Sequence, residues 1–351
     1  MNRHRVVVPC AVGVLLLFGA AARAVAAEPA AEDFYKGKQI HIILSSANSG
    51  GYYAFARLMT QYMPAHIPGH PTIIINNMEG AGGLKATNYL YNVAPRDGTY
   101  IAATHSSVPT APLLTPDGAQ FDVNKLQWIG SVTKDPFVGV VWHTAPIKSL
   151  EDAKTIDSIM GGTAVGAAGI DMAILGKEMF GLKFKIVTGY PNATDIYLAM
   201  ERGEIHGAFA SAWGSLKLTE SAKLKDGRMR VIVQYGFSKH PELPDVPLFM
   251  DLAKTDADRQ ALELELARQE FSKPYFAPPD VPPARLEILR RAFDATVKEP
   301  GFLKAAEEAQ LPVDEPMTGQ ELAALTARLS TTPTAVVKRI EDIFKKFTSG
   351  N

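Results

Sequence analysis

The chain is nearly without cysteine. Its 351 residues contain one, Cys10, so the rest of the chain offers no disulfide, no reactive thiol and no cysteine-ligated metal. Histidine gives no better metal site, because Pro68 stands between His66 and His70 and argues against the helix that their spacing would need. We therefore expect neither a metal nor a cofactor.

Signatures of several function classes are also missing. The 36 Lys and Arg residues nearly balance the 37 Asp and Glu residues, which is unlike the basic surface of a nucleic-acid-binding protein. Neither a Gly-x-Ser-x-Gly nor a His-Glu-x-x-His motif is present. Gly80–Gly83 fails the dinucleotide fingerprint because Lys85 occupies the third small position, and Gly176-Lys177 fails the phosphate-loop pattern. The chain is predicted not to be an enzyme.

The amino terminus has the pattern of a secretory signal peptide. A basic start, Met1–Arg5, precedes the apolar run Val6–Ala22 and the small-x-small sequence Ala24-Val25-Ala26. The apolar run is shorter than the ~20 residues of a membrane span and ends at Arg23, which disfavours a retained anchor. We expect residues 1–27 to be a cleaved signal peptide and the protein to be periplasmic.

The remaining chain predicts an α/β fold in two domains. A content of 46% hydrophobic and 21% charged residues is typical of a globular protein, and the length suits two domains. Strand-like apolar runs alternate with helical periodicity, which favours parallel sheets flanked by helices. The expected strands are Ile40–Leu44, Thr72–Ile75, Thr99–Thr104, Val138–Trp142, Phe184–Val187, Ala208–Ala210 and Val231–Gln234.

The last third of the chain is predicted to be mostly helical. Leu286, Leu289 and Phe293 form one apolar stripe, and a second stripe follows the final helix from Val336 to Phe347. Because an amphipathic helix must bury its apolar face, we expect the final helix to dock on the first domain.

Two strand-to-helix junctions are candidate ligand sites. The first passes through Ser45–Gly51 into a helix at Tyr52; the second follows a predicted strand at Thr163–Val165 and passes through Gly166–Asp171 into a helix at Met172. Each junction leaves unpaired backbone N–H groups at the positive end of a helix, where an anion binds. Two such ends facing each other would hold a carboxylate without requiring a cationic side chain.

Three residues near these junctions have two interpretations each. Asp171 is expected to be a helix N-cap rather than a ligand group. His105, which follows a strand and precedes Ser106 and Ser107, either lines the site or is a structural histidine. Trp213 is either a core residue or part of a cleft wall.

A series of motifs resembles the Bug family, the extracytoplasmic receptors of tripartite tricarboxylate transporters. The resemblance covers nearly all of the chain after the expected signal peptide, and the motifs together are fairly specific. After the Ser-Gly-Gly loop and Ala56–Leu58 they are Asn77–Gly83, Asn88–Gly98, Val187–Pro191, Leu198–Glu204, Leu243–Pro247, Phe276–Pro279 and Val281–Pro283.

The resemblance implies a periplasmic, two-lobed protein of the type II Venus-flytrap class, each lobe a sheet flanked by helices. Residues 33–137 with 238–351 would form lobe 1 and residues 138–237 lobe 2, with hinge strands near Asp135–Val141 and Gln234–Lys239. The lobes would close on a small carboxylate, such as a dicarboxylate, a tricarboxylate or an aromatic acid. A membrane transporter would be the docking partner of this monomeric receptor.

The resemblance also implies a set of ligand contacts. Lobe 1 would supply Ala47, Asn48, Ser49, Gly50, Gly51, Tyr52 and Tyr53, with His105, Ser106 and Ser107 nearby. Lobe 2 would supply Ala167, Ala168, Gly169, Ile170, Asp171, Met172, Tyr190, Asn192, Ser211 and Trp213.

Two residues depart from the family's pattern. Tyr53 stands where the family often has an Asp, and beside Tyr52 it favours an aromatic or less substituted acid. Glu79 stands where a proline is usual, and a carboxylate facing the cleft there would repel an anion.

Two other functions are open at this point. The receptor could signal to a membrane sensor and transport nothing. Alternatively, a secreted hydrolase could use Ser45 or Ser46 with His105, but it would need a buried acid to orient the histidine, and no candidate stands out in the sequence.

Overall fold

The computed structural model describes Met1 and residues 31–48, 50–114, 116–134, 136–163, 165 and 167–349. The expected signal peptide lies outside the described residues, apart from Met1, and so do Ser49, Gly166 and Asp135. Every helix within the described ranges is too short or too polar to cross a membrane.

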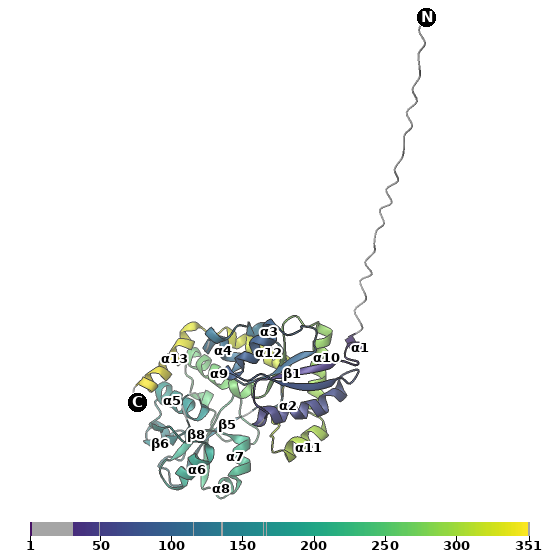
Figure 1. Cartoon of the computed structure of the whole chain (residues 1–351). Coiled ribbons are helices and arrows are strands. Elements are labelled where there is room, and N and C mark those ends of the chain that lie inside the picture. Colours follow the sequence, from purple (N-terminus) through teal and green to yellow (C-terminus); the bar gives the residue numbers. More distant parts are fainter. Residues whose placement is uncertain are drawn as a thin grey trace.

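The chain forms two sheets, each flanked by helices (Figure 1). The first sheet has six strands in the order β11-β4-β10-β3-β1-β2. They are β1 (Gln39–Leu44), β2 (Thr72–Asn77), β3 (Tyr100–Ala103), β4 (Gln127–Ser131), β10 (Pro274–Ala277) and β11 (Met317–Thr318). The expectation of a parallel sheet is correct for β1, β2 and β3 but wrong for the whole, because β10 enters antiparallel between β3 and β4.

The second sheet has five strands in the order β7-β6-β8-β5-β9. They are β5 (Phe137–Trp142), β6 (Ser158–Gly161), β7 (Phe184–Val187), β8 (Gly207–Ala212) and β9 (Met229–Gln234). β6 runs parallel to β7 and β8, whereas β5 is antiparallel to β8 and β9. Two mixed sheets with helices on their faces make the two-lobed architecture. The residue boundaries of the lobes stay a prediction.

Alternating side chains of β1 place helices on both faces of the first sheet. Ile40, Ile42 and Leu44 point into one core, and Ile43 points into another. The first core is shared with α1 (Ala31–Phe34), α2 (Gly50–Tyr62), α10 (Pro283–Thr296) and α11 (Pro300–Glu308), and the second with α3 (Leu84–Asn92) and α12 (Gly319–Ser330). In Figure 1, α2 and α3 accordingly lie on opposite sides of β1.

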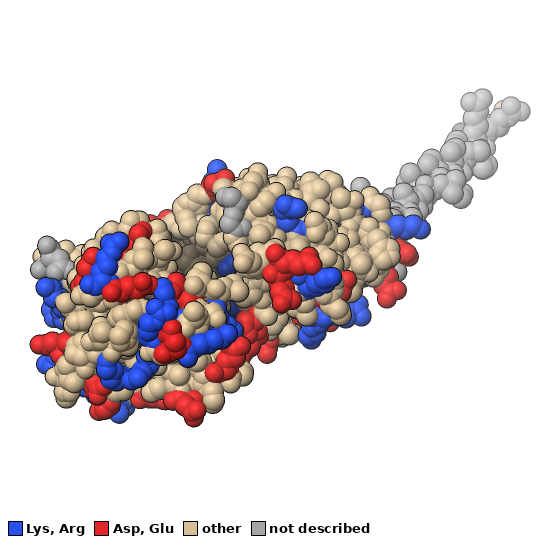
Figure 2. Space-filling model, turned by 90° about the horizontal axis from the view of Figure 1, so that it is seen from below, with Lys and Arg blue, Asp and Glu red and all other residues tan. Residues whose placement is uncertain are grey.

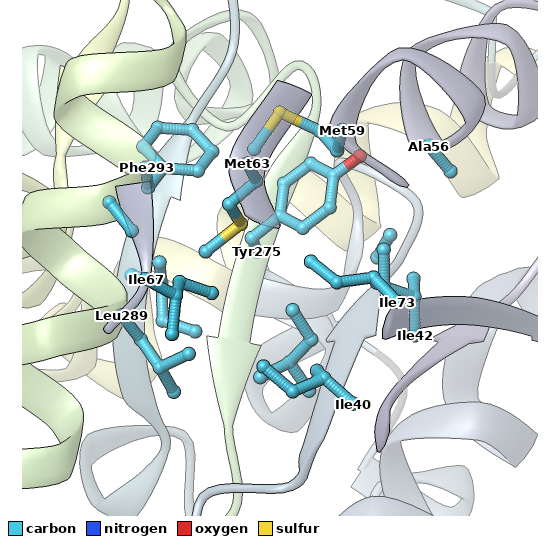
Figure 3. Packing of buried hydrophobic residues seen from close by; sticks show 14 of the residues in the cluster. Ile40, Ile42, Ala56, Met59, Met63, Ile67, Ile73, Tyr275, Leu289 and Phe293 are labelled. Atoms are coloured by element: carbon cyan, nitrogen blue, oxygen red, sulfur yellow. The ribbon is translucent and has the colours of Figure 1, made fainter. Parts of the chain in front are cut away.

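Side chains from distant parts of the chain meet in the core beneath α2 (Figure 3). Ile42 of β1, Met59 of α2, Tyr275 of β10 and Phe293 of α10 belong to one buried cluster. Tyr275 also pairs with Ala103, the last residue of β3. Since β10 is antiparallel, the residues just before it lie at the carboxyl ends of β1 and β3, the edge where open α/β sheets bind ligands.

The second sheet has the same layered construction. Its core on one face includes Met160, Phe209 and Phe249 with residues of α5 (Ala168–Phe180). The core on the other face includes Val140 and residues of α6 (Ala193–Glu201) and α7 (Trp213–Thr219). The short helix α8 (Ser221–Lys225) follows α7.

Helix α9 (Asp256–Glu270) lies between the two sheets (Figure 1). Leu262 and Leu266 pack into a core of the second sheet, while Ala267 packs into a core of the first. The Oε1 atom of Gln269 accepts a hydrogen bond of 2.9 Å from the backbone N–H of Phe137, the first residue of β5. α9 is therefore a common wall of both lobes.

The final helix, α13 (Thr334–Ser349), packs against α9 and α5 (Figure 1). Val336, Val337 and Ile340 form a buried cluster with Ala261 and Leu264 of α9, flanked by Leu113 and Leu114 of the short helix α4 (Ala111–Leu114). The expectation that this helix docks on the first domain is therefore correct in part. Its apolar stripe packs against α9 and α4, which belong to the residues expected to form the first domain, and the helix also packs against α5 of the second sheet.

Replacing Ile340 with Ala should lower the free energy of unfolding by about 2–5 kcal/mol, the usual cost of truncating a large aliphatic core side chain. Ile340 is 1% exposed. Urea unfolding followed by circular dichroism measures the loss, with Lys345→Ala as control, because the Lys345 side chain is 72% exposed. If the two variants lost the same small amount, α13 would not be docked as described.

Candidate functional site

A pocket of about 190 Å³ lies where the two lobes and α9 meet. Tyr52 and Ser106 border it from lobe 1, and Ala168 and Met172 border it from α5 of lobe 2. The remaining lining residues are Phe137, Glu265, Arg268, Gln269, Ser272 and Lys273. The two helix starts singled out in the sequence therefore border one pocket.

The start of α2 forms the lobe 1 side. The helix begins at Gly50, and its first N–H groups have no acceptor within the helix, so this end is a partial positive charge. A Cβ atom added to Gly51 would lie 3.6 Å from Cε of Lys273. The aliphatic part of that lysine therefore runs along the first turn of α2.

Tyr52 contacts three residues around this helix start, namely His105, Ser106 and Lys273. Its hydroxyl accepts a hydrogen bond of 3.1 Å from the backbone N–H of Ser106. Its ring centroid lies 4.8 Å from that of His105, and Nζ of Lys273 lies 4.5 Å above the same ring. The Ser106 amide is thus engaged with Tyr52, and the ring is part of the pocket wall.

His105 lies behind Tyr52 and is not among the residues that line the pocket. Its Nδ1 atom is 3.0 Å from Oγ of Ser45, a residue that is 2% exposed. Burial lowers the pKa of His105 below its ordinary value, and the positive charge of Lys273 lowers the pKa further. The imidazole is therefore neutral near neutral pH.

The Ser45–His105 pair is a poor hydrolytic centre. In a triad the nucleophile binds one imidazole nitrogen and an acid orients the other. Within the described part of the chain, no carboxylate is hydrogen-bonded to His105, and Ser45 is buried away from the pocket. The pair is better explained as a structural contact beneath Tyr52.

The start of α5 forms the lobe 2 side. The strand before it, β6, ends at Gly161. Thr163 and Val165 belong to no strand, so the strand expected at Thr163–Val165 is wrong at these two residues, and Ala164 lies outside the described residues. The backbone N–H of Gly189 donates to the carbonyl oxygen of Thr163, which belongs to an irregular connection. The helix begins at Ala168 rather than at Met172, with first-turn N–H groups directed toward its start.

Asp171 is not the N-cap that the sequence suggested. The N-cap of α5 is Ala167, without a capping side chain, and Asp171 lies in the first turn at 2% exposure. Its carboxylate is 3.3 Å from Arg268, whose guanidinium is also 2.6 Å from Glu265. Burial by itself lowers the pKa of Arg268, but the two carboxylates raise it above its ordinary value. This ion cluster ties α9 to the start of α5.

Several other predicted contacts of lobe 1 lie beside the pocket or are used elsewhere. Asn48 is exposed and Ala47 half-buried in the loop before α2, and Tyr53 packs against the first core. The Ser107 hydroxyl donates to the carbonyl oxygen of Gly82 at 3.3 Å. Glu79 is exposed.

The remaining predicted contacts of lobe 2 do not line this pocket. Trp213 belongs to a core cluster, and its indole N–H donates to Glu242 at 2.7 Å, which favours the core interpretation. Asn192 caps α6, Tyr190 packs near Gly161, and Ser211 is buried. Gly169 and the buried Ile170 are in the first turn of α5.

Sequence reasoning missed the contribution of α9 and the residues after it. The end of α9 and the residues just after it supply half of the pocket lining. These lining residues are Glu265, Arg268, Gln269, Ser272 and Lys273. The local signal was weak, because charged residues on a helix are usually on a solvated face. These side chains face the pocket because α9 lies between the two lobes.

One face of the molecule carries side chains of both charges (Figure 2). Figure 2 shows acidic and basic side chains interspersed over the part of one face that the structure describes. The described residues also contain no group of three or more His, Cys, Asp or Glu side chains placed to hold a metal ion. Attraction for an anion is thus local, from helix ends and from Lys273.

Comparison with known proteins identifies the family of this chain. Residues 56–342 match the model of the tripartite tricarboxylate transporter family receptor, TctC. The chain belongs to this family. Its members are periplasmic solute-binding receptors that work with membrane transporter subunits. The resemblance inferred from the sequence motifs is confirmed. None of the curated proteins is similar to the chain at a significant level.

Solved structures confirm the two-lobed, type II fold. A TctC solute-binding protein from Polaromonas has a TM-score of 0.69 at 18% identity, over 88% of this chain and 99% of the other. MatC from Rhodopseudomonas palustris with bound malate has a TM-score of 0.52 at 19% identity, over 88% and 99%. R. palustris Rpa4515 with adipate has a TM-score of 0.52 at 17% identity, over 88% and 96%.

Replacing Lys273 with Met should raise the pKa of His105, because a nearby positive charge that disfavours the imidazolium is removed. Titration of the imidazole by NMR measures the change. Lys38→Met is the control, because Lys38 is exposed and lies over Phe34. An unchanged His105 pKa in Lys273→Met would mean that burial alone lowers it.

The lowered pKa of His105 also predicts how the stability of the protein changes with pH. Because the folded state holds the neutral imidazole, the contribution of His105 is complete above the ordinary pKa of 6.5 and is lost as the pH falls below it. The free energy of unfolding, measured by urea at several pH values, should therefore decrease less below pH 6.5 in Lys273→Met than in the native protein. An equal decrease would contradict the coupling.

Proposed function

We propose that the protein is a periplasmic receptor that captures a small carboxylate between its lobes and delivers it to a tripartite tricarboxylate-type membrane transporter. The observation that carries the proposal is the pocket bordered by the starts of α2 and α5. N–H groups at helix starts are well suited to carboxylate oxygens. The function is binding and release, without catalysis.

The pocket's size and walls support a small acid. About 190 Å³ is below the ~300 Å³ at which pockets for drug-sized ligands begin. Tyr52, Phe137 and Met172 supply apolar surface, and polar groups stand at both helix starts. The malate of MatC and the adipate of Rpa4515 are acids of this size class in proteins of similar fold.

In this proposal, capture works by lobe closure. Lobe 1 comprises residues 33–137 and 238–351, and lobe 2 residues 138–237, with hinges near Asp135–Val141 and Gln234–Lys239. The predicted contacts from Ala47 to Tyr53 and from Ala167 to Met172 approach the ligand from opposite sides. Residues 1–27 direct export and are removed, and the mature receptor acts as a monomer.

A receptor that signals to a membrane sensor is the second candidate. The same pocket would serve it, since ligand capture is common to both. Neighbouring genes for transporter membrane subunits favour delivery, whereas a neighbouring sensor kinase favours signalling. A hydrolase is disfavoured by the burial of Ser45.

A thermal-shift screen of the purified protein tests the proposal. Malate, adipate, benzoate, citrate and amino acids are added separately, and a ligand at 100 times its dissociation constant should stabilise the fold by about 2.7 kcal/mol. The expected result is stabilisation by one or more acids. A complete panel of carboxylates without any shift would overturn the proposed function.

Gly51→Pro and Gly169→Pro should each weaken binding of the acid found in that screen by at least roughly tenfold, because each removes an amide donor that bonds a charged group. Proline is tolerated in the first turn of a helix, so the fold should persist. Gly51→Ala and Gly169→Ala keep the N–H and should lose much less, since the added Cβ would lie 3.6 and 3.4 Å from its nearest neighbour. Calorimetric titration measures the affinities; undiminished binding in both proline variants would count against the helix starts.

A further inference from the structure

We infer that Lys273 contacts the ligand, supplying a positive charge for its carboxylate, and that the ligand carries a hydrocarbon body. This inference rests on the proposed function and names a specificity-determining residue of the same pocket. Neither the junction motifs nor the helix starts point to this lysine.

The backbone of Lys273 is fixed to lobe 1. Its N–H donates to Oγ of Ser131 at 3.1 Å, and its carbonyl oxygen accepts from the N–H of Val132 at 3.2 Å. The next residue, Pro274, begins β10. The side chain therefore starts from a rigid position at the ligand-binding edge of the first sheet.

The side chain of Lys273 brings its ammonium to the start of α2. Its stem passes Gly51, and Nζ lies 4.5 Å above the ring of Tyr52. One hydrogen bond of the ammonium goes to the neutral hydroxyl of Ser272, at 3.1 Å. The lysine is half-buried and lines the pocket.

A cation beside a helix N-terminus is electrostatically unfavourable by itself. The helix end is a partial positive charge, and a lysine there is repelled, whereas an anion is attracted. A carboxylate bound between the ammonium and the first-turn N–H groups of α2 turns this repulsion into two attractions. The arrangement therefore suits a protein whose bound state contains an anion at this point.

Arg268, the other cation that lines the pocket, has a different role. Its guanidinium is shared by Asp171 and Glu265, both almost fully buried. The charge of Arg268 is therefore already engaged with buried carboxylates, whereas the ammonium of Lys273 stands at the start of α2, and we assign the ligand carboxylate to the Lys273 side.

The apolar walls determine the rest of the ligand. Tyr52, Phe137, Ala168 and Met172 surround the space between the two charged sides. Burying a hydrocarbon chain or ring against them is favourable at about 25 cal/mol per Å² of apolar surface. A hydroxylated acid of the same length would place polar groups against these walls and would gain less.

Calorimetric titration with acid–amide pairs tests the role of Lys273. The probes are hexanoate with hexanamide, benzoate with benzamide, and malate with malamide, titrated into the native protein, Lys273→Met, Lys273→Arg and the control Lys38→Met. Lys38 is exposed and also places its ammonium over an aromatic ring, that of Phe34, at 5.6 Å. Circular dichroism checks that each variant is folded.

The expected result has three parts. Lys273→Met should lose roughly tenfold or more in affinity for the acid that binds, because a charge-assisted contact is removed, while its binding of the matching amide changes little. Lys273→Arg should keep most of the affinity, and Lys38→Met should bind as the native protein does. Hexanoate or benzoate should bind the native protein more tightly than malate.

The outcomes separate this inference from the proposed function. If no acid binds the native protein, both are overturned. If an acid binds but Lys273→Met binds it equally well, or loses acid and amide to the same extent, the role of Lys273 alone is overturned. If malate binds more tightly than hexanoate and benzoate, the hydrocarbon body is overturned.

Discussion

The antiparallel entry of β10 into the first sheet is the constraint on which the pocket depends. It pairs with β3 and β4, so its first residue lies at the carboxyl ends of the parallel strands β1 and β3. That edge is where helix starts and ligands gather in open α/β sheets. The segment before β10 therefore arrives beside the start of α2 and brings Lys273 to Gly51 and Tyr52. A parallel strand in this position would have placed its leading segment at the opposite edge.

Buried charges hold α9, the helix before β10, against the second sheet. Arg268 joins α9 to Asp171 in the first turn of α5, and removing one partner from such a cluster leaves a buried charge uncompensated. α13 covers α9 and α5 with its apolar stripe. These three helices therefore pack together where the two lobes meet.

Local sequence patterns predicted the fold correctly where the spacing of apolar residues decides which side chains are buried. Ile40–Leu44 alternates between two cores, and the loop after it opens α2, as its glycines indicated. At the second junction, Thr163–Val165 is strand-like in composition, but β6 has already ended at Gly161. The carbonyl oxygen of Thr163 accepts a hydrogen bond from the N–H of Gly189. The lining residues of α9 were missed for a different reason. A charged residue on a helix is normally expected to face solvent unless a distant partner buries it, and Asp171, one of the two partners of Arg268, is 97 residues away.

Concentrating positive charge at one point explains how a slightly acidic protein could select an anion. The full chain has a net charge of −1, so its overall field attracts no anion, and any selection must act over a few ångströms. His105 is close to Lys273, and a protonated imidazole there would add a second positive charge behind Tyr52, away from the pocket. Burial and Lys273 together lower its pKa and keep the ring neutral. The positive side-chain charge at this point is therefore that of the Lys273 ammonium beside the start of α2, where the amide donors would act on the same oxygens of a bound carboxylate. A carboxylate at this position meets both in a partly desolvated space, in which each interaction is stronger than in water.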